Sequence, residues 1–324
     1  MMLLITGSSG FLGQALCLEA AERGLTVRAA SRSCIDFPVA LESVAVGEID
    51  GNTDWLDALR RCDVVVHCAA RVHVMREDAA DSLTEFRLVN VKGTLNLARQ
   101  AAAAGVRRFV FVSSVKVNGE ETLPGQAFTE GDVPAPQDPY GQSKHEAELG
   151  LRQLAADTGM EVVIIRPPLV YGPGVKANFA ALMCVVQRGW PLPLGAVRNH
   201  RSLVALDNLV DLIVTCLHHP AAANQTFLVS DGKDLSTTEL VRGMAQAAGV
   251  QVSLWRVPVW VLQAAAGALG KGAAVQRLCG NLQVDITKAR TLLGWVPPVS
   301  VDEGLRVAAG HGLQGFARND GRLE

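Results

Sequence analysis

A glycine-rich turn near the start of the chain constrains the fold more than any other feature. The apolar run Leu3–Thr6 has the length of a strand, and a helical pattern starts at Phe11. Gly7, Gly10 and Gly13 surround the junction. Because glycine has no side chain, backbone amides can approach a pyrophosphate, and the N-terminus of the following helix adds partial positive charge. At this position the triplet predicts a dinucleotide-binding domain; the alternative is a tight turn that only packs the helix against the strand.

The first half of the chain alternates strand-length apolar runs with helical patterns, which is typical of a parallel sheet covered by helices. We therefore predict an α/β protein with a Rossmann-type doubly wound parallel sheet and a smaller C-terminal α/β part. The predicted strands are Leu3–Thr6, Val27–Ala30, Val44–Val46, Val64–Cys68, Arg108–Val112 and Val162–Arg166. The predicted helices start near Phe11, Thr53, Ser82 and Pro139, and the third runs to Ala104.

The pattern becomes less regular in the second half, where prolines are frequent. We expect residues 1–169 to form the dinucleotide-binding domain, with the catalytic residues. Residues 170–324 are expected to form mainly a substrate-binding part, with some segments returning to the sheet.

Composition narrows the class of partners. The formal net charge is -2 with a pI near 6.4, and this gives no reason to expect nucleic acid or an anionic membrane. The seven cysteines show no metal-type spacing, which favours reduced thiols, no metal site and a cytoplasmic protein. The apolar stretch Val257–Gly270 contains Pro258 and is shorter than the roughly 20 residues of a membrane span. It is predicted to be a buried or interfacial helix.

Two further motifs carry groups suited to proton transfer. Tyr140 and Lys144 stand four residues apart, after Pro139, so a helix places them on one face. A lysine ammonium beside the phenol is expected to lower the tyrosine pKa, making an acid/base for an alcohol–ketone pair. Ser114 follows the fifth predicted strand at the edge where ligands bind, although it could instead cap a turn.

The end of the second strand lacks the usual acid. An Asp or Glu there hydrogen-bonds the adenosine ribose and repels a 2′-phosphate, whereas this chain has Ser31 and Arg32. A guanidinium is a good partner for a phosphate, so the pair favours NADP(H), with NAD(H) possible. Arg28, on the strand itself, is expected to be less able to reach. The alternative is a solvated surface arginine with NAD held by backbone contacts.

The motifs TGSSGFLG, HCAA, VNVKGT, SSVKVNG, YGQSK and RPPLVYGPG occur in this order and together resemble the extended short-chain dehydrogenase/reductase family. RSLVALDNLVD and DITKARTLLGW resemble its C-terminal region. Within the family, the chain is similar to the sugar-nucleotide epimerases, dehydratases and reductases of bacterial surface-polysaccharide synthesis. The resemblance implies a UDP-sugar substrate and a homodimer formed through the helices that start near Ser82 and Pro139.

The resemblance also implies roles for individual residues. The implied catalytic residues are Ser114, Tyr140 and Lys144. The implied cofactor-binding residues are Gly7, Ser9, Gly10, Phe11, Leu12, Gly13, Ser31, Arg32, Glu48, Ile49, Ala69, Ala70, Asn90, Tyr140, Lys144 and Pro167. The implied substrate-binding residues are Arg71, Ser114, Asn178, Arg201 and Arg277.

One further departure from the family pattern leaves the reaction open. Many epimerases and dehydratases have tyrosine where this chain has Asn118. Together with the missing acid, this favours a 4-ketoreductase that makes a UDP-N-acetyl-6-deoxyhexose. The alternatives are a UDP-glucose or UDP-N-acetylglucosamine 4-epimerase with tightly bound NAD, and a catalytically silent NADP-sensing scaffold.

Overall fold

The computed structural model describes residues 1–72, 79–268, 270 and 272–316. Its main feature is a sheet of seven strands in the order β3-β2-β1-β4-β5-β6-β9, and all the paired strands run parallel. The predicted Rossmann-type fold is confirmed. The strands are β1 (Met2–Thr6), β2 (Thr26–Ser31), β3 (Glu42–Ala45), β4 (Val64–His67), β5 (Arg108–Val112), β6 (Glu161–Arg166) and β9 (Thr226–Leu228).

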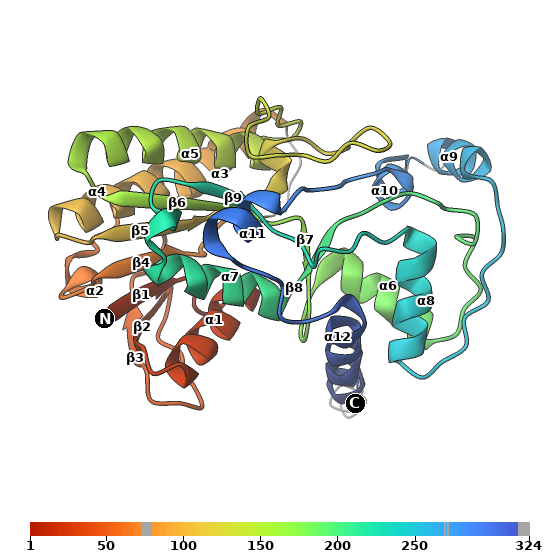
Figure 1. Ribbon diagram of the computed structural model, residues 1–324, viewed down its shortest axis with the longest axis horizontal. Helices are drawn as coiled ribbons and strands as arrows, with labels where there is room; N and C mark the ends of the chain where they lie inside the picture. Colours follow the sequence, from red (N-terminus) through yellow and green to blue (C-terminus); the bar gives the residue numbers. More distant parts are fainter. Residues whose placement is uncertain (73–78, 269, 271, 317–324) are drawn as a thin grey trace.

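Helices cover both faces of this sheet, and a separate apolar core lies under each layer (Figure 1). α1 (Phe11–Glu22) and α7 (Leu206–His218) pack together on one face. The other face carries the short α2 (Leu56–Leu59), α4 (Thr94–Ala103) and α5 (Pro139–Thr158). Strands buried on both sides explain the uninterrupted apolar runs.

The predicted third helix is longer than expected and is not regular. It comprises α3 (Ala79–Phe86), a π-helical segment (Arg87–Gly93) and α4. The helix expected near Thr53 begins only at Leu56, because the Thr53 hydroxyl closes a turn by accepting from the Asp50 amide and donating to the Glu48 carbonyl.

The later part of the chain forms a third core and also contributes to the large sheet. β9 pairs with β6, so the sheet gains a strand from beyond residue 170. Beside it stands a two-stranded sheet, and helices surround the third core in the right-hand half of Figure 1. These elements are β7 (Leu169–Tyr171), α6 (Ala177–Gln187), β8 (Leu203–Ala205), α8 (Thr237–Ala247), α9 (Val259–Ala268), α10 (Gly272–Cys279) and α12 (Val301–Phe316). α11 (Thr287–Leu293) instead packs against β9 and belongs to the apolar core that α1 and α7 cover. Within the described residues, no helix is both long and apolar enough to cross a bilayer.

A buried ion pair joins α5 to the sheet. Arg166, the last residue of β6, donates from Nε and Nη2 to the two carboxylate oxygens of Glu148, at 2.9 and 2.6 Å. Both side chains are buried. Ser113 donates to the same carboxylate at 2.6 Å, and the Asn118 side-chain oxygen accepts from Arg166 at 2.9 Å. One network therefore holds the ends of β5 and β6, the following loop and the middle of α5 in register.

Replacing Glu148 with Gln is expected to destabilise the protein by about 3 kcal/mol or more, because it leaves the Arg166 guanidinium buried without its counter-charge. The matched control is Arg152→Ala. Arg152 also donates to Glu148, at 3.0 Å, but it is partly exposed, so its loss should cost about 0.5 kcal/mol. Urea unfolding of both variants measures the two effects. Equal losses would contradict a central role for the pair.

His67, the last residue of β4, is buried between two hydroxyls. Its Nδ1 lies 2.7 Å from Thr6 Oγ1 and its Nε2 lies 3.0 Å from Thr94 Oγ1. Burial, helped by the positive charge of Lys144, lowers the pKa of His67 to about 3. The imidazole is therefore neutral in the folded protein.

Since the unfolded chain binds a proton near pH 6.5 and the folded chain does not, His67 should make stability depend on pH. Stability is fully present above the unfolded pKa and falls as the pH drops towards the folded pKa, by at most about 1.4 kcal/mol per pH unit. The stability gap between the wild type and His67→Asn should narrow on acidification. A gap that stays constant from neutral pH down would contradict a neutral buried imidazole, and the exposed His200→Asn serves as the control.

Candidate active site

The glycine turn lies at the carboxyl edge of the sheet, at the point where the strand order changes direction between β1 and β4. Gly7 has φ of +68°, and a Cβ added there would lie 2.7 Å from the Ala69 amide nitrogen. A Cβ on Gly13 would lie 2.2 Å from the Gly7 carbonyl oxygen. Only glycine fits at either position, and α1 begins directly after Gly10. The turn leaves backbone and a helix N-terminus at the carboxyl edge of the sheet, as a pyrophosphate requires.

The second wall of the site follows β4. Asn90, in the π-helical segment, is buried and its side-chain oxygen accepts from the Arg71 amide at 2.9 Å. Its side-chain nitrogen donates to the Arg71 carbonyl and to Ser143 Oγ, each at 3.0 Å. Asn90 therefore ties the Ala69–Arg71 segment to α5. π-helical turns are frequent at functional sites, and this one places the Asn90 side chain between the segment after β4 and α5.

α5 begins at the same edge of the sheet, and the residues at its N-terminus strongly favour the start of a helix. Asp138 caps the helix by accepting from the Gly141 amide at 2.6 Å, and Pro139 occupies the first turn. Lys116 forms an ion pair with the same carboxylate. The Tyr140 ring packs edge-on against Phe86 at 6.0 Å between centroids. The position of the phenol is thus set by the helix cap and by α3.

Lys144 lies one turn further along α5 and is buried. Its Nζ donates to the Val112 carbonyl at 2.8 Å and lies 6.0 Å from the centroid of the Tyr140 ring. Burial lowers the pKa of Lys144 to about 8. Burial, with a smaller effect from Asp138, raises the pKa of Tyr140. The expectation that the lysine beside it lowers the tyrosine pKa is therefore wrong, because burial of the phenol raises it.

The two serines after β5 have different partners. Ser113 is buried and committed to Glu148. Ser114 is partly exposed, and its Oγ accepts from the Lys116 amide at 3.2 Å while capping the short 3₁₀ turn Val115–Val117. Capping the turn uses only an acceptor, so the Ser114 hydroxyl proton stays available to a substrate oxygen.

Two of the residues expected at the ribose end face each other across the ends of β2 and β3. Arg32 Nη1 lies 3.4 Å from Glu48 Oε1, and both side chains are exposed, 75% and 80% respectively. Ser31 is buried and donates to the Ser33 carbonyl. Arg28 is buried with an ion pair to Glu42, which agrees with its expected inability to reach a ligand. A carboxylate therefore does lie near this edge, although it comes from the loop after β3 and not from the end of β2.

The structure places the other implied residues in two groups. Ser9 is exposed, whereas Phe11, Leu12, Ile49, Ala69 and Ala70 are partly buried around the turn. Pro167 is buried beyond β6, and its carbonyl accepts from Val115. The substrate residues of the later part are spread over α6 (Asn178, exposed), the strand-like segment before β8 (Arg201) and α10 (Arg277). Arg201 donates to the Gly280 carbonyl at 3.2 Å, and burial lowers its pKa.

Several positioning residues were not found from the sequence. Asp138, directly before the Pro139 that the sequence did point to, carries a readable capping signal, but the roles of Glu148, Arg166 and Phe86 depend on contacts between distant elements. The glycine turn would hold a dinucleotide phosphate, and Tyr140 and Lys144 lie at the same edge of the sheet, at the start of α5. Bound there, the nicotinamide would supply and accept hydride.

Comparison with known proteins agrees with this site. A model of the NAD dependent epimerase/dehydratase family matches residues 3–230. A relative from Vibrio cholerae, named UDP-glucose 4-epimerase, is 50% identical over 314 residues, which cover 96% of this chain and 95% of the relative.

Two solved structures share the fold. MoeE5 in complex with UDP-glucose and NAD has a TM-score of 0.78 at 24% identity, covering 98% of this chain and all of that one. RMD from Pseudomonas aeruginosa complexed with NADPH has a TM-score of 0.72 at 22% identity, covering 96% and 99%.

The glycine turn, the Tyr140–Lys144 helix and the whole-length similarity lead to one conclusion. The protein is an enzyme that uses a nicotinamide dinucleotide, and the chain belongs to the NAD dependent epimerase/dehydratase family.

Proposed function

We propose that this enzyme is a UDP-hexose 4-epimerase that works with bound NAD. The observation that carries the chemistry is the Tyr140–Lys144 pair on α5, held at the same edge of the sheet as the glycine turn. The 50% identity with the Vibrio cholerae UDP-glucose 4-epimerase supports the choice of substrate and reaction.

In this proposal Tyr140 takes the proton from the sugar C4 hydroxyl and returns it to the same oxygen after the ketone is reduced. Ser114 donates a hydrogen bond to that oxygen. Lys144 holds the nicotinamide ribose, and its ammonium opposes the effect of burial on the phenol. A bound nicotinamide dinucleotide would supply reversible hydride transfer at C4, so an epimerase would consume no outside reductant.

A second candidate is reduction of a 4-keto sugar nucleotide with NADPH, which the sequence favoured first. The similarity to an epimerase supports this reduction less well than it supports epimerisation. Asn118 is the observation in its favour. The Asn118 side chain is buried, accepts from Arg166 and donates to the Thr129 carbonyl at 2.8 Å, so no aromatic ring stands at this position. The silent scaffold has no comparable support, because Ser114, Tyr140 and Lys144 are all present.

The Arg32–Glu48 pair bears on the choice of cofactor. A guanidinium at this edge would attract a 2′-phosphate, whereas a carboxylate 3.4 Å away would repel it and suits a ribose hydroxyl. Glu48 therefore weakens the case for NADP and is consistent with NAD. The homodimer through the helices that start near Ser82 and Pro139 remains a prediction.

Replacing Tyr140 with Phe is expected to lower kcat for interconversion of UDP-glucose and UDP-galactose roughly 10²- to 10⁴-fold, because the acid/base is lost. Leu149→Ala, an exposed position on the same helix, is the control for helix packing. Unchanged turnover in Tyr140→Phe would remove Tyr140 from the mechanism.

The cofactor assignment is tested by titrating apo-protein with NADH and NADPH. Glu48→Gln should raise the preference for NADPH about five-fold, and Arg32→Ala should lower it by a similar factor, as expected of single exposed charges. If neither variant changes the ratio, the two side chains do not face the ribose.

Denaturing the purified protein and identifying the released dinucleotide separates the two candidate reactions. Retained NAD, with sugar interconversion and no net oxidation of added NADPH, is expected. An empty protein that oxidises NADPH with a 4-keto sugar nucleotide, and leaves UDP-glucose unchanged, would make it a reductase.

A further inference from the structure

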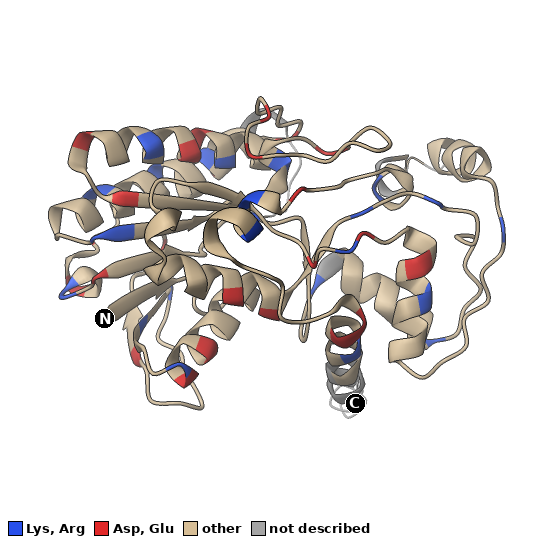
Figure 2. Ribbon diagram, viewed as in Figure 1, with Lys and Arg blue, Asp and Glu red and all other residues tan. Residues whose placement is uncertain are grey.

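The C-terminal part has an asymmetric charge distribution. The sequence contains no Asp or Glu at residues 162–206 or at residues 240–284, although it has 32 acidic residues in all. These two stretches supply β7, α6, β8, α9, α10 and most of α8. Figure 2 shows several Lys and Arg residues, and few acidic ones, over this part of the molecule. A formal net charge of -2 averages over this difference.

Tryptophans gather on the same part. Of the five in the chain, Trp55 and Trp295 are buried, whereas Trp190, Trp255 and Trp260 are exposed by 55, 60 and 71%. Trp190 and Trp255 belong to paired segments, because the Leu192 amide donates to the Ser253 carbonyl and the Trp255 amide donates to the Leu192 carbonyl, both at 2.9 Å.

Trp260 lies on α9, five residues after Trp255. α9 contains no charged residue over its ten residues, and Trp260, Ala264, Ala265 and Ala268 on it are exposed. Exposed large apolar side chains gathered in this way mark an interaction surface.

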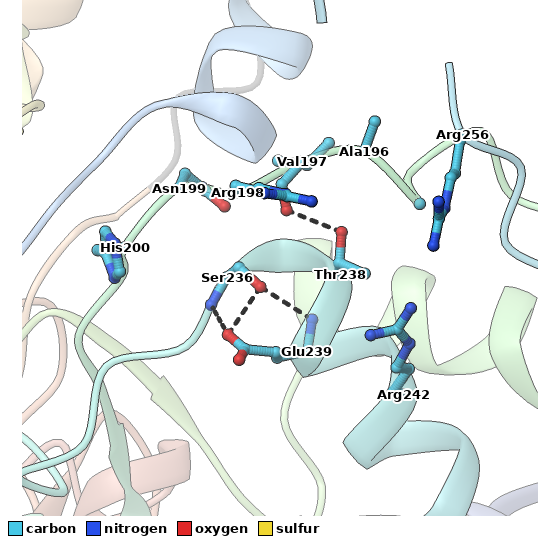
Figure 3. Close-up of a pocket in the computed structure, with 11 residues that line it drawn as sticks. Ala196, Val197, Arg198, Asn199, His200, Ser236, Thr238, Glu239, Arg242 and Arg256 are labelled. Carbon is cyan, nitrogen blue, oxygen red and sulfur yellow. Dashed lines mark hydrogen bonds between the residues drawn. The ribbon is translucent and has the colours of Figure 1, made fainter. Parts of the chain in front are cut away.

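Beside the tryptophans is a cavity of about 480 Å³ between the Gly195–His200 loop, α8 and Arg256. Arg198, Arg242 and Arg256 line it, and Figure 3 shows Arg242 and Arg256 pointing toward one another. None of the three has an ion-pair partner among the described residues.

The one carboxylate in the lining is already engaged. Glu239 accepts from the Ser236 amide and hydroxyl in a capping box at the start of α8. Like charges that converge on a cavity without a counter-charge repel one another, so the arrangement suits an anion. The residues implied in substrate binding do not line this cavity, nor do Ser114, Tyr140 and Lys144.

We propose that this surface, formed by Trp190, Trp255, Trp260, Arg198, Arg242 and Arg256, docks on an anionic phospholipid bilayer. Tryptophan rings partition to the boundary between headgroups and acyl chains, where an uncharged helix such as α9 can also lie. The arginines would bind headgroup phosphates. α9, at ten residues, is too short to span and would lie along the surface.

A second copy of the chain is a poorer occupant of this surface. A symmetric contact would bring the same unpaired arginines of two copies together, which costs electrostatic energy. An anionic bilayer instead offers opposite charge together with an apolar layer, and so it complements both parts of the surface.

The test is co-sedimentation of the full-length protein with vesicles of phosphatidylcholine alone and of phosphatidylcholine with phosphatidylglycerol. The wild type should bind the anionic vesicles, less strongly at high salt, with a blue shift in fluorescence from its exposed tryptophans. Arg242→Ser with Arg256→Ser should lower the partition coefficient about five-fold per arginine on anionic vesicles only. Trp255→Ser with Trp260→Ser should lower it on the order of ten-fold and abolish the shift.

The matched control is Leu56→Ser with Arg60→Ser, which removes an exposed apolar residue from α2 and the exposed arginine that follows it. It should bind like the wild type, and all variants should keep their cofactor binding and their activity on a soluble substrate. Three results would overturn the proposal. They are absence of binding to anionic vesicles, equal loss in the control, and self-association that only the surface variants abolish. Binding of inorganic phosphate to the arginine cavity without vesicle binding would likewise make it a site for a soluble anion.

Discussion

The bidentate contact between Glu148 and Arg166 is the constraint on which the active site depends. Removing two charges from water is costly, and good geometry with further hydrogen bonds is needed to offset that cost. The protein meets this need with Ser113 and Asn118, which come from β5 and from the loop after it. Tyr140, Lys144 and Glu148 follow one another at intervals of four residues, so they lie along one face of α5. Anchoring Glu148 at the sheet therefore also orients the two residues above it.

Much of the fold could be predicted because its signals are local. The glycine turn, the apolar strands and the Asp138–Pro139 start of α5 are each readable within a few residues. The Glu148–Arg166 pair could not be predicted in the same way, since a charged residue in a helix usually faces solvent and its partner lies on another element. Glu48 illustrates the same limit. Its nearness to Arg32 depends on the pairing of β2 with β3, which the sequence does not display.

The electrostatics of the site could be predicted only in part. A lysine one helical turn from a tyrosine indicates a lowered phenol pKa, but the direction also depends on how deeply the phenol is buried, and here burial raises the pKa. The net charge was also an incomplete guide to binding partners. It describes the whole chain, whereas the unpaired Arg198, Arg242 and Arg256 occupy one cavity. The direction of the pKa shift and the charge of a local surface both depend on where the side chains lie in three dimensions.

The position of β9 has a consequence for how the two parts of the molecule can move. The chain leaves the large sheet after β6, returns with α7 and β9, leaves again for α8, α9 and α10, and comes back with α11, which packs against β9. The two parts are therefore joined by several connecting segments of the chain and not by a single linker. A rotation about a single hinge would strain all the other crossings, so opening of the substrate side is restricted to small sliding motions and loop rearrangements. For the same reason residues 1–169 alone would lack the strand that covers β6 and the helix that packs on α1.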